Sequence, residues 1–311
     1  MNTILTRDPA EAAEFIKRGG IVAFPTETVY GLGANVFDAR ALSRIFDAKQ
    51  RPSDNPLIVH VANVSQVLEV ASEVTFSARA FIERFWPGPL TVVLPKHGKV
   101  PDVASASLQT IAVRMPKALV ALEFLECCNV PVAAPSANLS GRPSPTTWQA
   151  VAEDLDERID CILQGDATEK GLESTVVDCT GAIPVILRSG SVTLEDLRTV
   201  ISATRAGSVG DKTDRSPGTR HRHYKPTAKV VIIEHPDAIE KAAGTSYIGL
   251  GRSVTPFDHQ LICRDVEDYA RHLYEFLRDC DRRGIHTIYC QEVTESGIGV
   301  ALMDRLRRAA G

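Results

Sequence analysis

Short apolar runs alternate with amphipathic segments along most of this 311-residue chain. Apolar runs bounded by glycine and proline are typical of buried strands, whereas apolar residues three and four positions apart are typical of helices. The strand-like runs before the middle of the chain are 21–24, 57–61, 90–94 and 111–114. This alternation predicts an α/β fold.

Local signals predict where several helices begin and end. A helix over 11–18 ends at Gly19-Gly20, and Asp38 is a good N-cap for a helix that continues through Ala48. A helix through Phe85 must stop at the two prolines of the segment 86–89. Further helices are indicated by the apolar stripe in 148–155 and by a capping box of Thr193 and Asp196.

A change of composition divides the chain. Residues 203–226 are rich in Gly, Ser, Thr, Arg and His and have no periodicity, which indicates a linker. Beyond it, strand-like runs at 229–234, 247–250 and 287–290 and a helix over 266–280 predict a small second α/β domain. The predicted partition is a catalytic domain over 1–202, a linker over 203–228 and a C-terminal domain over 229–311.

Composition excludes several classes of protein. A net charge of −4 gives no chain-wide attraction to nucleic acid or anionic lipid, so any polyanion site must be local. Seven cysteines without a C-x-x-C pair indicate reduced thiols, not a disulfide framework or a zinc site. No apolar run reaches the ~18 residues of a membrane span, and the N-terminus lacks a signal peptide pattern. We therefore expect a cytoplasmic protein without membrane contact.

The segment 23–61 sets hydroxyls, His60 and two cations around glycine-rich backbone, which suits a cleft for phosphates and a small polar substrate. Gly31 and Gly33 lack the third glycine of a dinucleotide fingerprint, and no P-loop motif occurs. These two glycines are equally well explained as parts of a tight turn. Phosphates would instead be held by side chains that end strand-like or helix-like runs. The candidates are Lys49, Arg51, Arg114 and Arg188, for which a solvated surface charge is the alternative.

Other polar residues in apolar surroundings have structural alternatives. Ser136 and Ser144 follow a buried strand over 131–134, but Ser144 also fits the start of a helix. Ser174 is compatible with simple β-propensity, and His60 with a hydrogen-bonded core histidine. A pair of histidines at 221 and 223 has no third ligand at a sensible spacing, so we expect no protein metal site.

Ordered motifs along the chain resemble those of the two-domain form of the threonylcarbamoyl-AMP synthase family. They cover most of residues 15–226 and continue more weakly to residue 299. The motifs are Thr26-Glu27-Thr28, Lys49-Gln50-Arg51, Ser53-Asp54-Asn55-Pro56, 110–116, 134–141, 174–178, 187–190 and 216–226. The resemblance implies a YrdC-like twisted mixed sheet with helices, followed by a small Rossmann-like α/β C-terminal domain.

The resemblance also implies roles for individual residues. Lys49 and Arg51 would be catalytic. The L-threonine pocket would consist of Thr28, His60, Arg114, Ala134 and Ser174. The ATP contacts would be Arg51, Asn55, Thr110, Ser136, Ser144, Arg188 and Tyr224.

The implied reaction converts ATP, L-threonine and bicarbonate or CO2 into L-threonylcarbamoyl-adenylate and pyrophosphate. Mg2+ is expected on the triphosphate. The adenylate would pass to a separate transferase that modifies an adenosine beside a tRNA anticodon. Because three anionic partners must be held together, a pocket with several cationic side chains suits this reaction.

Two alternative functions remain open from the sequence. An RNA-binding protein is one, because the segment 215–229 is basic and contains no acidic residue, so weak tRNA contact is expected there. A carbamoyl transferase of the hydrogenase-maturation type is the other, but such proteins carry paired C-x-x-C zinc motifs, which this chain lacks.

The linker itself is predicted to be a lid. Residues 203–226 are too polar to build a core and too long for a plain connection. Tyr224 and the basic run 220–223 offer stacking and charge to ATP. Closure of such a lid would exclude water from a hydrolysable carbamate and adenylate.

Overall fold

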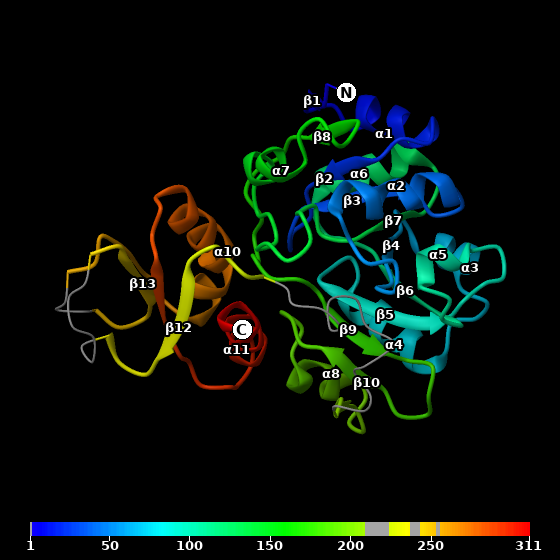
Figure 1. Ribbon diagram of the computed structural model, residues 1–311. Helices are drawn as coiled ribbons and strands as arrows, with labels where there is room; N and C mark the ends of the chain where they lie inside the picture. The colour runs from blue at the N-terminus through cyan, green and yellow to red at the C-terminus, as the bar shows by residue number, and fades with distance from the viewer. Residues whose placement is uncertain (1, 209–223, 237–242, 253–255) are drawn as a thin grey trace.

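The computed structural model describes residues 2–208, 224–236, 243–252 and 256–311, and these residues form two sheets with helices against them (Figure 1). The larger sheet has eleven strands in the order β1-β8-β2-β3-β7-β4-β6-β5-β9-β10-β11. Its strands are β1 (Ile4–Thr6), β2 (Val22–Phe24), β3 (Gly31–Asn35), β4 (Ile58–His60), β5 (Leu90–Pro95), β6 (Thr110–Arg114), β7 (Val132–Ala134), β8 (Cys161–Leu163), β9 (Thr175–Asp178), β10 (Val185–Arg188) and β11 (Arg205–Ala206).

Helices accompany this sheet, and several begin and end where the sequence predicts. Asp38 caps α2 by accepting from two backbone N–H groups, Thr193 and Asp196 form the capping box of α8, and α4 ends directly before Trp86-Pro87. The helices are α1 (Pro9–Lys17), α2 (Ala39–Lys49), η1 (Val64–Gln66), α3 (Val67–Val70), α4 (Phe76–Phe85), α5 (Asp102–Ser105), α6 (Leu119–Cys128), α7 (Trp148–Leu155) and α8 (Leu194–Val200).

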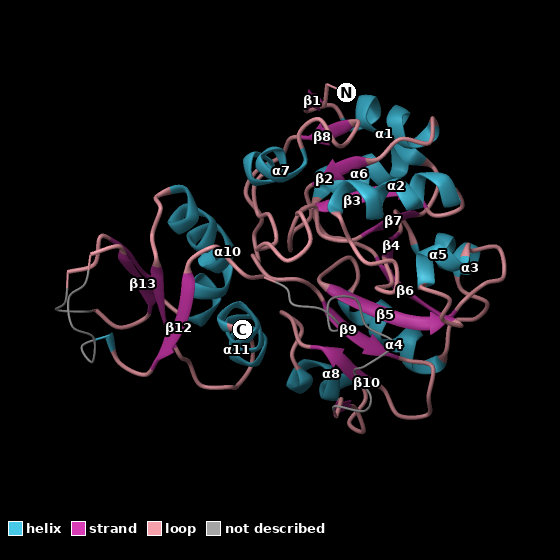
Figure 2. Cartoon of the chain, viewed as in Figure 1, coloured by secondary structure: helices cyan, strands magenta, loops and turns pink. Residues whose placement is uncertain are grey.

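The larger sheet is mixed, and its central strands are buried on both faces, whereas its edge strands β1 and β11 are largely exposed. β2 pairs parallel with β8 but antiparallel with β3, and β4 pairs parallel with β6 but antiparallel with β7. Alternate residues of a strand point to opposite faces. Accordingly, Ala23 packs in the hydrophobic cluster that contains α2, whereas Val22 and Phe24 pack in the cluster that contains α1 and α6. The expected twisted mixed sheet is confirmed (Figure 2).

The interpretation of Gly31 and Gly33 as a tight turn is wrong, because both lie in β3. Gly33 pairs with Val22 of β2. A Cβ atom at position 33 would lie 2.5 Å from Cγ1 of Val132 and 3.0 Å from Cε1 of Phe24. These glycines are therefore required by close packing between neighbouring strands and not by turn geometry.

The C-terminal residues form a parallel four-stranded sheet in the order β12-β15-β13-β14. Its strands are β12 (Lys229–Ile233), β13 (Thr245–Gly249), β14 (His259–Ile262) and β15 (Thr287–Gln291), and its helices are α10 (Val266–Arg282) and α11 (Gly299–Ala310). Figure 1 shows α10 and α11 on the side of this sheet that faces the larger unit. The expected small α/β unit is present, although the sequence patterns did not predict β14 or α11.

A buried ion pair joins the two units. Arg278 of α10 donates to Asp154 of α7 at 2.7 Å, and both side chains are almost fully buried. The proposed partition of the chain at 203–228 stays a prediction. Residues 209–223, which include most of the predicted lid and of the basic segment, lie outside the described residues.

Two other sequence expectations concern the whole chain. All seven cysteines lie within the described ranges and are free thiols, and six of them are buried. A search of the described helices finds none with the length and hydropathy needed to cross a membrane.

Candidate active site

A pocket lined by both polar and apolar side chains opens on the larger unit. Its wall comes from the β2–β3 connection, strands β4 and β6, the segment after β7, the residues before β9, the end of β10, and Tyr224. The lining residues are Thr26, Thr28, Val29, Tyr30, Gly31, Arg51, Ile58, His60, Arg114, Ala134, Pro135, Ser136, Asn138, Ser144, Glu173, Ser174, Arg188 and Tyr224.

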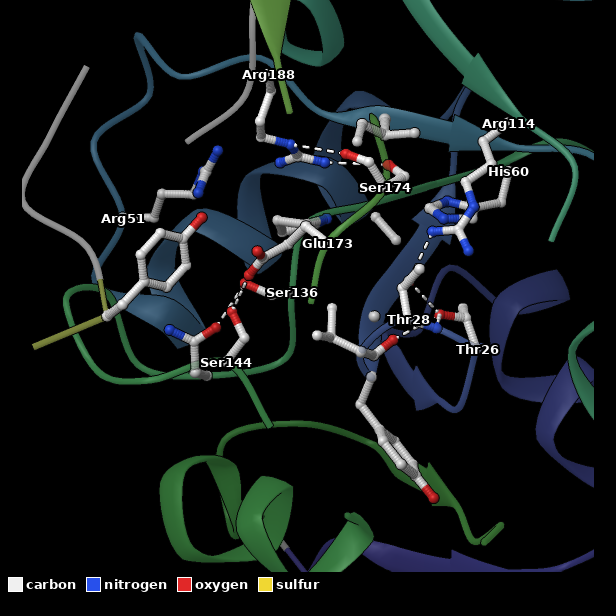
Figure 3. A pocket seen from close by; sticks show the side chains of 18 residues that line it. Thr26, Thr28, Arg51, His60, Arg114, Ser136, Ser144, Glu173, Ser174 and Arg188 are labelled. Atoms are coloured by element: carbon white, nitrogen blue, oxygen red, sulfur yellow. Dashed lines mark hydrogen bonds between the residues drawn. The ribbon is translucent and has the colours of Figure 1, made fainter. Parts of the chain in front are cut away.

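The pocket brings together ten of the thirteen residues that the sequence singled out. The three that are not among its lining residues are Lys49, Asn55 and Thr110. Figure 3 shows that the lining residues separate into two groups. Thr26, Thr28, His60 and Arg114 lie at one end, and Arg51, Ser136, Ser144, Glu173 and Arg188 lie toward the other. The assignment of these two groups to a threonine subsite and an ATP subsite stays a prediction, and Ser174 of the predicted threonine set is bonded to Arg188 of the predicted ATP set.

Arg114 is the central cation of the first end. Its Nε donates to the Gly88 carbonyl at 3.2 Å and its Nη1 donates to Oγ1 of Thr28 at 2.8 Å. Its Nη2 lies 2.6 Å from Oε1 of Glu27, and both charged side chains are buried. Glu27 is fixed in turn by the Lys117 N–H, which donates to its Oε2 at 3.0 Å. The guanidinium is therefore held in one orientation by three contacts.

His60 lies beside Arg114 and is neutral over the physiological pH range. Burial, helped by the positive charge of Arg114, lowers the pKa of His60 to about 3. The imidazole contacts Phe24 edge to face, with 5.6 Å between ring centroids. Its buried Nδ1 has no hydrogen-bond partner in the described part of the chain. A neutral imidazole here can donate or accept a hydrogen bond without adding charge.

The shifted pKa of His60 predicts a pH dependence of stability. The unfolded chain binds a proton at this residue near pH 6.5, whereas the folded chain does not until about pH 3. Stability therefore falls as the pH drops below about 6.5, by about 1.4 kcal/mol per pH unit from this group. Urea unfolding at pH 6.5 and 5.5 measures the effect. Because the group in the unfolded chain is already half protonated at pH 6.5, its share of the difference between these two pH values is about 1 kcal/mol. His60→Gln should reduce the difference by that amount, and an unchanged difference would contradict the assignment.

The second end of the pocket carries two further buried arginines. Arg188 donates from Nε to the Ser174 carbonyl and from Nη2 to Oγ of Ser174, both at 3.1 Å. Arg51 lies where the chain leaves α2, and its Nη2 lies 3.3 Å from the carbonyls of Asn55 and Pro56. Burial lowers the pKa of Arg51 to about 10 and also lowers that of Arg188. A neighbouring positive charge adds to the effect of burial in both cases: that of Arg188 for Arg51, and that of Arg305 for Arg188.

Of the three residues outside the pocket lining, Lys49 and Asn55 contact residues of the lining. Lys49 is fully buried at the end of α2 and donates from Nζ to the carbonyls of Ser136, at 2.6 Å, and of Asn138. Burial and the nearby Arg51 charge lower the pKa of Lys49 well below its usual value. Asn55 supplies the carbonyl that Arg51 contacts, and Thr110 begins β6 opposite Pro95. The geometry thus places Lys49 as a support for the Ser136 segment.

The structure also resolves two open alternatives. Ser144 does not begin a helix, because α7 starts at Trp148 with Thr147 as its N-cap. Instead, Oγ of Ser144 donates to Oε1 of Glu173 at 2.6 Å, deep in the pocket wall. Ser174 is not only a strand former, because it precedes β9 and its Oγ is bonded by Arg188.

Sequence reasoning missed Glu173 and Glu27 as parts of the site. Both are buried carboxylates beside predicted site hydroxyls, and both are paired with arginines distant in sequence. The motifs Thr26-Glu27-Thr28 and Glu173-Ser174-Thr175 carried a usable signal, because an acidic residue next to hydroxyl residues in a strand-rich region is rarely buried unless it is paired.

Family models and a solved structure match this chain in its sequence and its fold. A family model described as "Telomere recombination" matches residues 14–190, and one described as "Threonylcarbamoyl-AMP synthase, C-terminal domain" matches residues 192–311. The structure of Escherichia coli YciO, 24% identical, has a TM-score of 0.55 and covers 63% of this chain and 98% of its own, which supports the fold of the larger unit.

Full-length relatives are more specific. The threonylcarbamoyl-AMP synthase of Pyrococcus abyssi is 45% identical over 96% of this chain and 93% of its own, and that of Bacillus subtilis is 41% identical over 98% and 94%. The crystal structure of P. abyssi Sua5 complexed with L-threonine matches with a TM-score of 0.92 at 43% identity, over 100% of this chain and 98% of its own. The chain therefore belongs to the threonylcarbamoyl-AMP synthase family, as the motifs indicated.

Proposed function

We propose that this protein is a nucleotidyltransferase that converts ATP, L-threonine and bicarbonate or CO2 into L-threonylcarbamoyl-adenylate and pyrophosphate. The observation that carries the proposal is a single pocket with two chemically different ends. One end has a fixed guanidinium, a neutral imidazole and a hydroxyl, which suit an amino acid. The other has two arginines and several hydroxyls, which suit a nucleotide. Family membership supports the same reaction.

The chemistry needs positioning and charge stabilisation more than a protein nucleophile. The threonine amine and bicarbonate form a carbamate and water, and a carbamate oxygen then attacks the α-phosphorus while pyrophosphate leaves. In this proposal, Arg114 binds the threonine carboxylate, and Arg51 and Arg188 offset the negative charge on the phosphates. A buried, preorganised set of cations can stabilise this charge at low reorganisation cost.

Mg2+ and the downstream partners belong to the same proposal. ATP enters with Mg2+ on its triphosphate, because oxygen ligands from phosphates are those that Mg2+ prefers. The adenylate is consumed by a separate transferase that modifies tRNA. Direct tRNA contact through the basic segment 215–229 stays a prediction, since most of that segment lies outside the described residues.

Pyrophosphate release tests the proposed reaction. We expect release only when ATP, L-threonine and bicarbonate are all present, with a threonine-containing AMP derivative as the second product. A coupled phosphate assay and mass spectrometry of the products measure both. Release that needs only ATP, or that is independent of bicarbonate, would contradict the proposal.

Selectivity for threonine over serine is a second expected result. Thr28 and Ser174 lie in the pocket wall together with Ala134, whose methyl group offers an apolar contact to the threonine methyl. The loss of one methyl contact is worth about 1–3 kcal/mol, so kcat/KM for serine should be roughly 10- to 200-fold lower. Parallel kinetics with the two amino acids measure the ratio. Equal values would show that these residues do not surround the side chain.

A further inference from the structure

The Glu173 carboxylate connects the pocket to the C-terminal unit. It lies in the pocket wall and accepts hydrogen bonds from three separate parts of the chain. Ser144 donates to Oε1 at 2.6 Å, Tyr274 of α10 donates from its hydroxyl to Oε2 at 3.0 Å, and Arg305 of α11 donates from Nε to Oε2 at 3.0 Å. Two of the three donors therefore come from helices of the smaller unit.

The same two C-terminal residues also hold Tyr224. The ring of Tyr224 stacks on that of Tyr274, with 5.2 Å between centroids and 24° between planes. Cζ of Arg305 lies 5.7 Å from the centroid of the Tyr224 ring, within the range of a cation–π contact. Tyr224 lines the pocket and has a left-handed backbone conformation, with φ of 68°. Such a conformation is uncommon for a tyrosine and persists where surrounding contacts determine it.

The Arg305 guanidinium has two further partners besides Glu173, so it does more than hold the two units together. Its side chain is fully buried, its Nη2 donates to the Ser189 carbonyl at 3.0 Å, and its Nη1 pairs with Asp304 at 2.9 Å. Ser189 directly follows Arg188, the last residue of β10, and Glu173 lies two positions before β9. The Arg305 guanidinium therefore contacts the chain both where β10 ends and just before β9 begins. Burial alone would raise the pKa of Glu173, but the charges of Arg305 and Arg188 hold it below its usual value. Glu173 therefore remains an ionised acceptor.

We propose that Arg305 and Tyr274 are positioning residues for ATP. They act from behind the pocket wall, through Glu173 and Tyr224, which themselves line the pocket. Glu173 aligns Ser144, and Tyr274 and Arg305 together fix the ring of Tyr224, so the C-terminal unit sets the shape of the nucleotide end of the pocket. Within the described ranges, the hydrogen bonds and ring contacts of these two side chains involve none of Thr28, His60 and Arg114 at the threonine end. This inference rests on the proposed function and specifies what the C-terminal unit contributes to it.

Steady-state kinetics of three full-length proteins test the proposal. Tyr274→Phe removes the hydroxyl donor to Glu173 but keeps the ring that stacks on Tyr224. The double variant Arg305→Met with Glu173→Gln removes the guanidinium without leaving an unpaired buried carboxylate. The control is Arg282→Ala, which breaks an exposed contact between α10 and Glu153 of α7, away from the pocket. Melting temperature is measured for each protein.

The expected result is a selective change in the KM for ATP. Tyr274→Phe should raise it about three- to tenfold, in line with the loss of one hydrogen bond, and the double variant should raise it more than about tenfold. The KM for threonine should stay within about twofold in both, and Arg282→Ala should leave both constants unchanged. Calorimetric titration with ATP alone should show the same loss of affinity.

Two outcomes would overturn the inference. One is an unchanged KM and calorimetric affinity for ATP in Tyr274→Phe and the double variant. The other is an equal rise in the KM for ATP and for threonine, which is the result expected of a purely structural role. Failure of the proposed function is distinguishable, because in that case the wild-type chain itself would release no pyrophosphate with all three substrates, while ATP titration would still compare the variants.

Discussion

Arg114→Lys is expected to raise the KM for L-threonine at least about thirtyfold and to leave the KM for ATP within about threefold. The Arg114 side chain uses three of its five N–H groups on Gly88, Thr28 and Glu27, which aim the rest of the planar group at the pocket. A lysine ammonium can neither reproduce this fork nor hold Thr28 and Glu27 together. Removing one member of a buried, hydrogen-bonded charge pair costs about 2–5 kcal/mol, which sets the lower limit of the effect.

The matched control for Arg114→Lys is Arg84→Lys, the same change at an exposed position of α4. Initial rates with threonine varied at saturating ATP and bicarbonate measure the effect, and circular dichroism confirms that the fold is retained. An unchanged KM for threonine would move Arg114 to a structural role. An equal rise in the KM for ATP would show that the two ends of the pocket are not separate subsites.

Local sequence signals predicted the helix ends that depend on residues close in sequence. The Asp38 cap, the Thr193 and Asp196 capping box and the stop before Pro87 each depend on residues close in sequence, and the structure confirms them. Helix α11 was missed because no side-chain cap marks its start at Ile298. Strand β14 was missed because it is a partly exposed edge strand without a buried alternate face.

Local patterns could not predict which strands pair when they are distant in sequence. The order of the larger sheet places β4 between β7 and β6, which nothing in the β4 segment itself specifies. The same holds for the site: motif resemblance named its hydroxyls and arginines, but the partners of Glu173 and Glu27 were not foreseen. Glu173 and Arg305 are 132 positions apart, so only the folded chain shows that a C-terminal helix contacts a residue of the pocket wall.

Arg188 illustrates how tertiary geometry turns a strand residue into a site residue. The pairing of β10 with β9 shifts register between Ile186 and Arg188. Such an irregularity re-aims the side chains that follow it. Arg188 consequently points into the pocket and binds both the carbonyl and the hydroxyl of Ser174. Because Ser174 also lines the pocket, this guanidinium and the Ser174 hydroxyl lie side by side in the pocket wall (Figure 3).

We therefore expect Arg188→Ala to lower kcat/KM for ATP about 10²- to 10³-fold. The loss of one preorganised donor at a developing negative charge is worth about 2.7–4 kcal/mol. Arg188→Lys should recover part of the activity, because it restores the positive charge but not both contacts with Ser174. Single-turnover formation of the AMP derivative, compared with Arg84→Ala as the exposed control, separates chemistry from product release. A kcat/KM within about threefold of wild type would show that Arg188 supports Ser174 without acting on the phosphates, and would leave Arg51 as the cation that the reaction depends on.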